Sequence, residues 1–79
     1  MQSKPLNELK VGQAGQIAKL EASGAARHRL MEMGMIRGER IEVMRMAPLG
    51  DPLEYQIKGY RLSLRKDEAR QILVEVEND

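Results

Sequence analysis

The chain has 79 residues, with 13 basic and 12 acidic side chains that leave a net charge of +1. Nucleic-acid-binding proteins normally carry a strong basic excess, and here only Tyr55 and Tyr60 offer rings for base stacking, so we expect no nucleic-acid partner. Because cysteine is absent, disulfides and thiolate metal sites are excluded. A chain of this length builds one core, which predicts a single domain over residues 1–79.

Membrane and export signals are not visible in the sequence. No apolar run approaches the roughly 20 residues that cross a bilayer. The first ten residues, MQSKPLNELK, lack the apolar region of a signal peptide. We therefore expect a cytoplasmic protein without direct membrane insertion.

The N-terminal part is predicted to form a turn and then a strand. The turn covers residues 6–11, and its apolar side chains should enter the core: Leu6, Leu9 and Val11. The strand covers residues 13–20, with Ile17 facing inward. Gly12 and Gly15 near its start indicate a bulge or a close backbone approach.

A helix is predicted between Ser23 and Met33. Its apolar residues recur at i, i+4 and i+7, which puts them on one helix face: Ala26, Leu30 and Met33. Ser23 is a favourable N-cap residue. Gly34 stands where a residue with a left-handed backbone ends many helices.

Beyond Gly38, apolar and polar residues alternate, as they do in half-buried strands. A strand over residues 39–47 places Ile41 and Val43 inward. The inward residues of the next two strands are Leu53, Tyr55, Ile57, Leu62 and Leu64. Residues 66–69 predict a helical turn. The last strand carries Ile72, Val74 and Val76 inward.

These elements predict a mainly β fold. The middle strands follow one another through short turns, which favours an antiparallel meander, and a short final strand would close its edges. We therefore predict a small SH3-like β-barrel of five to six strands, with one inserted α-helix and a short helical turn before the last strand.

The segment APLGDP, residues 47–52, joins two of these strands. Pro48 and Pro52 cannot donate to a strand ladder, Gly50 can adopt a positive φ, and Asp51 can accept hydrogen bonds from nearby backbone. The segment is interpreted either as a stiff hairpin-type loop or as an exposed tip that presents Leu49 to a partner.

No pattern of residues indicates catalysis. The chain has no GxxxxGK[ST] loop for nucleotide phosphates. It has three serines and one histidine, and the sequence does not connect them into a nucleophile, a base and an orienting acid. We predict that the protein is not an enzyme.

Methionine is concentrated in one part of the sequence. Five of the six methionines fall within sixteen residues: Met31, Met33, Met35, Met44 and Met46. Flexible Met side chains can fill gaps in a core that lacks aromatic rings, or they can form an adaptable docking surface. Exposed members of this group would favour the docking surface.

An ordered set of short motifs resembles the FeoA family of small ferrous iron transport accessory proteins. The motifs are RLxxMGMxxG from Arg29, APLGDP from Ala47, LSLR from Leu62, and the pair Glu68 and Ala69. The resemblance covers the whole chain, and its members are SH3-like barrels, which agrees with the predicted fold. One departure is Arg37, where many members carry proline.

The resemblance implies a component of ferrous iron uptake. It implies as partner the membrane ferrous iron permease, whose cytoplasmic part has a G-protein-like, GTP-hydrolysing domain. For this contact we expect Met31, Met35 and Leu49 as apolar anchors and Arg27 as a residue that steers toward an acidic surface.

The alternative is a transition-metal sensor or delivery module, because the same barrel resembles the C-terminal domain of iron-dependent repressors. Its candidate ligands are weak: His28 with Glu32 one helical turn on, and Asp51 with Glu54 in the corner. No second histidine completes either set. We expect no resident cofactor, and at most weak binding of Fe²⁺.

Overall fold

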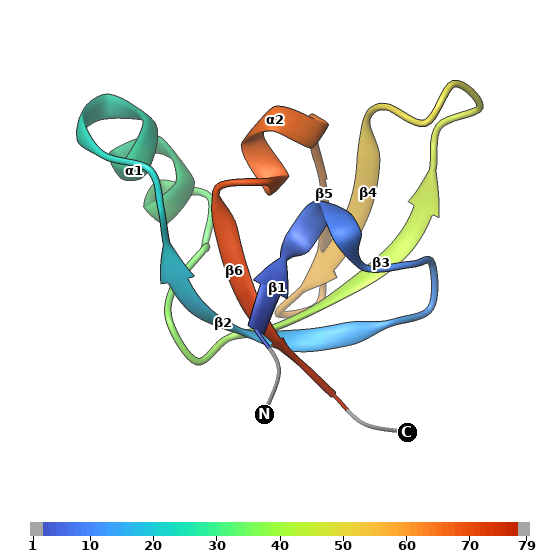
Figure 1. The fold of residues 1–79 in the computed structure, drawn as a ribbon, viewed down its shortest axis with the longest axis horizontal. Coiled ribbons are helices and arrows are strands. Elements are labelled where there is room, and N and C mark those ends of the chain that lie inside the picture. The colour runs from blue at the N-terminus through green and yellow to red at the C-terminus, as the bar shows by residue number, and fades with distance from the viewer. Residues whose placement is uncertain (1–2, 78–79) are drawn as a thin grey trace.

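The computed structural model describes residues 3–77, which form one antiparallel sheet with two α-helices and one 3₁₀ turn (Figure 1). In chain order the elements are β1 (Ser3–Pro5), η1 (Leu6–Glu8), β2 (Ala14–Leu20), α1 (Gly24–Glu32), β3 (Arg40–Met46), β4 (Leu53–Ile57), β5 (Tyr60–Leu64), α2 (Lys66–Ala69) and β6 (Ile72–Val76). The predicted elements are all present, and β1 is an additional short strand. None of the described helices has the length and apolar character that spanning a membrane requires.

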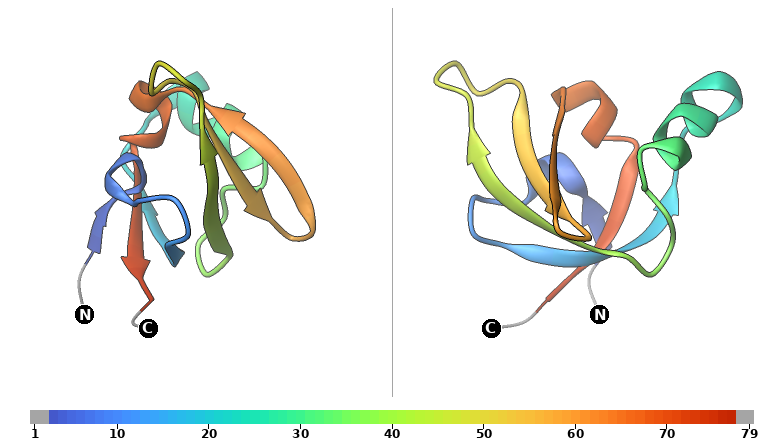
Figure 2. Two further views of the ribbon diagram at one scale, coloured as in Figure 1. Left: turned by 90° about the vertical axis from the view of Figure 1, so that its right-hand side faces the viewer. Right: turned by 180° about the vertical axis from the view of Figure 1, so that it is seen from behind.

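The strand order is β1-β6-β2-β3-β4-β5, so β2 to β5 form the predicted meander and β6 lies between β1 and β2. The fold is mainly β and SH3-like, but one detail of the expectation is wrong. Within residues 3–77, β1 and β5 are the two edges and do not pair with each other, so the strongly curved sheet stays open (Figure 2). Beside β6, η1 packs against α2.

The core follows from the alternation of side chains along the strands. The inward residues of β3, β4 and β6 are buried: Ile41, Val43, Leu53, Tyr55, Ile57, Ile72 and Val74. Tyr55 is the largest of the fully buried side chains. Two register shifts, between Ile17 and Lys19 in β2 and between Val43 and Arg45 in β3, bend the strands and let the sheet wrap around this core.

Gly15 marks a close approach between strands, as the sequence indicated. A Cβ atom at this position would lie 2.6 Å from the main-chain oxygen of Glu75 in β6. Real side chains do not tolerate such a contact, and the approach therefore requires glycine.

Val11 is exposed, contrary to the prediction that it enters the core with Leu6 and Leu9, which are buried. The reason is a tight turn. The amide of Gln13 donates to the oxygen of Lys10, and Gly12 has a φ of 93°. Val11 therefore stands at a turn position whose side chain points to solvent.

Helix α1 stands away from the sheet (Figure 1). Ser23 is its N-cap residue, but its side chain makes no capping hydrogen bond. Leu30 is the one buried residue of α1, Met33 beyond its end is half-buried, and Ala26 is exposed. The predicted apolar face is thus buried only toward its C-terminal end, because the N-terminal turns of α1 extend beyond the sheet.

A Schellman motif ends α1. The amide of Met35 donates to the oxygen of Leu30, and the amide of Gly34 donates to the oxygen of Met31, both at 3.0 Å. Gly34 has a φ of 98°, as the sequence predicted. This motif reverses the chain and brings the residues after it back under the helix.

Candidate protein-binding groove

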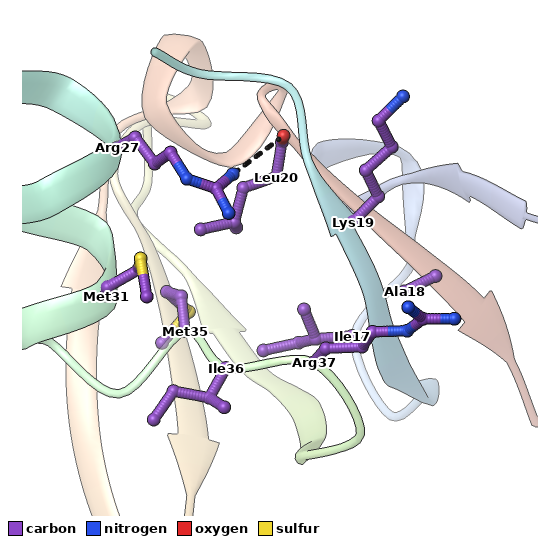
Figure 3. Close-up of a pocket in the computed structure, with 9 residues that line it drawn as sticks. All are labelled: Ile17, Ala18, Lys19, Leu20, Arg27, Met31, Met35, Ile36 and Arg37. Carbon is purple, nitrogen blue, oxygen red and sulfur yellow. Dashed lines mark hydrogen bonds between the residues drawn. The ribbon is translucent and has the colours of Figure 1, made fainter. Parts of the chain in front are cut away.

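A groove of about 230 Å³ lies between α1 and β2. Figure 3 shows its three sides: β2, the inner face of α1, and the segment that follows α1. The lining residues are Ile17, Ala18, Lys19, Leu20, Arg27, Met31, Met35, Ile36 and Arg37.

The groove exists because β3 pairs with only part of β2. The β2–β3 ladder covers Ala14–Gln16, and the backbone at Gly38 and Glu39 bonds to Ile17. From residue 18 to residue 20, the described structure has no strand on this side of β2, although β6 continues on the other side. The Schellman motif places Met35 at the base of this gap.

The floor of the groove is apolar and its walls are partly open. Ile17 and Met35 are buried, whereas Met31 is 43% exposed and Ile36 is 47% exposed. A 79-residue chain has few large apolar side chains to leave in water. Two of them beside one recess are typical of a binding surface.

The charged residues of the groove have one sign. Three of the nine lining residues are cationic, Lys19, Arg27 and Arg37, and none is acidic. Lys19 lies 3.6 Å from Glu21. Arg27 donates from Nη1 to the main-chain oxygen of Leu20 at 3.5 Å (Figure 3).

Three of the four residues expected to contact a partner line this groove, and two of the three are exposed. Arg27 and Met31 are exposed beside it. Met35 is expected to be an apolar anchor, but it is fully buried and forms the floor, because the chain reversal after Gly34 turns it toward the core.

Leu49, the fourth expected residue, is elsewhere. It is 96% exposed on the loop between β3 and β4, which lies at the opposite end of the long axis from α1 (Figure 1). Met31 and Leu49 therefore lie on different parts of the surface, and the expectation that both contact one partner stays a prediction.

The sequence reasoning missed Lys19, Ile36 and Arg37. Ile36 and Arg37 stand between two glycines, Gly34 and Gly38, in a segment without helical or strand periodicity. No local pattern separates the exposed Ile36 from Met35, which stands in the same connection and is fully buried.

The 47–52 loop is both stiff and exposed, so both interpretations of it describe part of the structure. The amide of Gly50 donates to the oxygen of Ala47 at 2.7 Å, and the amide of Ala47 donates to the oxygen of Pro52 at 3.0 Å. Asp51 Oδ1 accepts from the amide of Lys66 at 3.0 Å, which satisfies a free donor at the start of α2.

Some of the five clustered methionines fill the core, and others are exposed as a docking surface would require. Met33 and Met35 pack in or against the core, and Met44 is half-buried. Met31 and Met46 are exposed, and of these only Met31 lines the groove.

The weak metal candidates do not fit a ferrous ion. His28 Nε2 and Glu32 Oε2 are 3.9 Å apart on the exposed side of α1. Glu54 lies 3.8 Å from Arg45, and Asp51 caps α2. No three acidic, His or Cys side chains of residues 3–77 are grouped to hold an ion, whereas such ions take several such ligands.

A strongly curved antiparallel sheet with a helix inserted between β2 and β3 defines a small SH3-like domain. The model of the FeoA domain matches residues 4–76, and the chain belongs to the FeoA family.

Known proteins of similar sequence and structure agree with this assignment. A Fe(2+) transport protein A/Fe(2+) transporter FeoB fusion protein from Porphyromonas gingivalis is 42% identical over 71 residues, which are 90% of this chain and 8% of that protein. The chain thus spans a small part of this relative. The solved FeoA-like protein from Clostridium acetobutylicum is 37% identical, with a TM-score of 0.92 over 100% of this chain and 92% of that chain.

Two further solved structures bear on metal and fold. FeoA from Stenotrophomonas maltophilia, an SH3 domain protein complexed with zinc, is 28% identical, with a TM-score of 0.78 over 95% of this chain and 91% of that chain. A manganese-dependent transcriptional repressor is 18% identical, with a TM-score of 0.87 over 98% of this chain and 38% of that chain. At this identity the repressor shows a shared fold alone.

Proposed function

We propose that this chain is a non-enzymatic, cytoplasmic accessory protein of ferrous iron transport that binds the cytoplasmic, GTP-hydrolysing part of the iron permease. The observation that carries the proposal is the fusion relative, in which a segment 42% identical to this chain is joined to the transporter FeoB. Joining two modules in one polypeptide raises their effective concentration, which benefits domains that work together.

The groove beside α1 is the surface proposed for this contact. It combines an apolar floor with exposed Met31 and Ile36, as the central part of a protein interface does. Leu49, on the far loop, is a second apolar site that a large partner could reach only by extending across the molecule.

Binding to the purified cytoplasmic part of the permease tests the proposal. We expect Met31→Asp to weaken binding by about 2 kcal/mol or more, the loss typical of a central interface residue. Met46→Asp makes the same change at a methionine of similar exposure outside the groove and serves as the matched control. If the unsubstituted protein does not bind the permease part with or without GTP, the proposal is wrong.

A divalent-metal module is the alternative function, favoured by the zinc complex of the Stenotrophomonas maltophilia relative. Titration with Fe²⁺ under anaerobic conditions, followed by two-dimensional NMR, distinguishes it. This alternative predicts saturable changes near His28 or Asp51, and the leading proposal predicts none at micromolar metal.

A further inference from the structure

We propose that the groove beside α1 binds a segment of a partner protein in which one or two large apolar side chains are flanked by carboxylates. The inference rests on the proposed function, because it describes the part of the partner that the groove would hold. It goes further by stating the charge and polarity of that segment.

The positive charge of the groove indicates an acidic ligand. The chain as a whole is nearly balanced, with 13 basic and 12 acidic residues, but the groove has three cations and no carboxylate among its lining residues. Glu21 offsets Lys19 at 3.6 Å, so the positive charge of the groove comes mainly from Arg27 and Arg37. A recess lined by one sign of charge concentrates the opposite sign. An acidic segment therefore complements it, and a basic segment is repelled.

The two arginines differ in how far the chain itself engages them. Arg27 is held by a hydrogen bond of 3.5 Å to Leu20, at the outer limit of such bonds. Arg37 is exposed and forms neither an ion pair nor a side-chain hydrogen bond within the part of the chain that the structure describes. Its fork of donors is therefore open to a carboxylate.

The positions of Arg27 and Arg37 indicate where the carboxylates of the ligand would lie. In Figure 3, Arg27 extends from α1 toward Leu20, and Arg37 extends past Ile17 toward Ala18. Leu20 and Ile17 lie between the two guanidinium groups in this view, and the other apolar lining residues, Met31, Met35 and Ile36, lie on the α1 side. Cations thus lie on both sides of an apolar row. A ligand that satisfies all of these groups has an apolar centre and carboxylates on both sides, whereas a small anion would leave the apolar floor uncovered.

The free side of β2 provides the space for a polypeptide. Over residues 18–20 no described strand pairs with β2 on the groove side, so the recess is open along the strand and is not a closed cavity. A short segment of a partner can lie there without displacing an element of the fold.

A titration with synthetic peptides, followed by two-dimensional NMR of the full chain, tests the inference. The probe is the acetylated and amidated peptide Glu-Asp-Leu-Leu-Asp-Glu, which we expect to shift resonances of Met31, Ile36 and Arg37. Peptides with lysine in place of the acidic residues, or serine in place of leucine, should bind at least about fivefold more weakly. Arg37→Glu should weaken binding of the acidic peptide about tenfold.

The matched control is Lys10→Glu. Lys10 is an exposed cation in the connection between η1 and β2, and its reversal changes the net charge equally. That connection lies on the side of the molecule away from α1 (Figure 1). If both reversals have the same effect, general attraction explains binding and the groove does not. Equal binding of the acidic and basic peptides, or shifts produced by phosphatidylglycerol vesicles and not by the acidic peptide, would also overturn the inference.

Binding of the permease's cytoplasmic part to the same variants separates this inference from the proposed function. If that part binds the unsubstituted protein and Arg37→Glu equally well, the groove inference is wrong and the proposed function stands. If the acidic peptide binds the groove but the permease part does not bind at all, the partner is wrong and the groove chemistry stands.

Discussion

Tyr60 Oη donates a hydrogen bond of 2.6 Å to the main-chain oxygen of Met33, and this bond joins β5 to the C-terminal end of α1. Residues at the end of a helix have free carbonyl groups, so the bond satisfies one of them and holds the helix against the sheet. We therefore expect the orientation of α1, and with it the width of the groove, to depend on a residue from a different part of the sequence.

Tyr60→Phe tests this contact. We expect a loss of about 1 kcal/mol in the free energy of unfolding, typical of one hydrogen bond. Amide hydrogen exchange should become faster in α1 and stay unchanged in β3 and β4, because only the helix loses an anchor. Uniformly faster exchange across the sheet would mean that Tyr60 stabilises the whole fold and does not specifically hold α1.

Gly34 is expected to resist substitution more than Gly38, although both have a positive φ, 98° and 92°. Because alanine disfavours a positive φ, its substitution at either position should lower the free energy of unfolding by about 1 kcal/mol. A Cβ at Gly34 would also collide with the hydroxyl of Tyr60, whereas the space at Gly38 is open. Urea unfolding should therefore show a larger loss for Gly34→Ala. The double variant Gly34→Ala with Tyr60→Phe should recover part of the difference.

Tyr55 is predicted to lower stability at alkaline pH. Its side chain is fully buried, and its hydroxyl has no hydrogen-bond partner among residues 3–77. Burial, together with the negative charge of Asp51, raises the pKa of Tyr55 above its ordinary value. Because the unfolded chain ionises near pH 10 and the folded chain does so only at higher pH, stability should be complete below about pH 10 and fall as the pH rises further.

Tyr55→Phe tests the effect of the buried hydroxyl on stability at neutral and at alkaline pH. At pH 7 we expect stability equal to that of the unsubstituted protein or up to about 1 kcal/mol higher, since an unpaired buried hydroxyl is unfavourable. At pH 10.5 and above, the gain should grow. A loss of more than about 2 kcal/mol at pH 7 would indicate that the hydroxyl has a partner such as a bound water.

Glu68 is predicted to contribute more to the stability of the fold than its ion pair with Arg29 alone supplies. Arg29 Nη1 lies 3.0 Å from Glu68 Oε2, and the amide of Arg65 donates to Glu68 Oε1 at 3.0 Å. Arg29→Ala removes an exposed ion pair, which is expected to cost less than about 1 kcal/mol. Glu68→Ala also removes the capping bond of α2, for a total of about 1–2 kcal/mol. Equal effects of the two variants in thermal unfolding would contradict the capping role.

Local patterns predicted the elements well. Alternation in β3, β4 and β6 identified inward residues that are buried, such as Ile41, Tyr55 and Val74. Gly34 predicted the end of α1, because a left-handed backbone position selects for glycine in any context. The errors fall where a residue's surroundings are not set by its own element. Val11 is exposed by a turn, and Ala26 is exposed because α1 extends beyond the sheet.

The sequence by itself determined the SH3-like set of elements and the family, since periodicity, glycine positions and motifs are properties of short stretches of chain. It also named Met31 and Leu49 as candidate apolar contacts, but it left open whether their side chains are exposed. Only the tertiary structure decided which of these residues share a surface. The early departure of β3 from β2 opens a groove that brings Arg27, Met31 and Arg37 together. The curvature of the sheet places Leu49 at the far end, because the position of a loop in space depends on pairing between segments that are distant in the sequence.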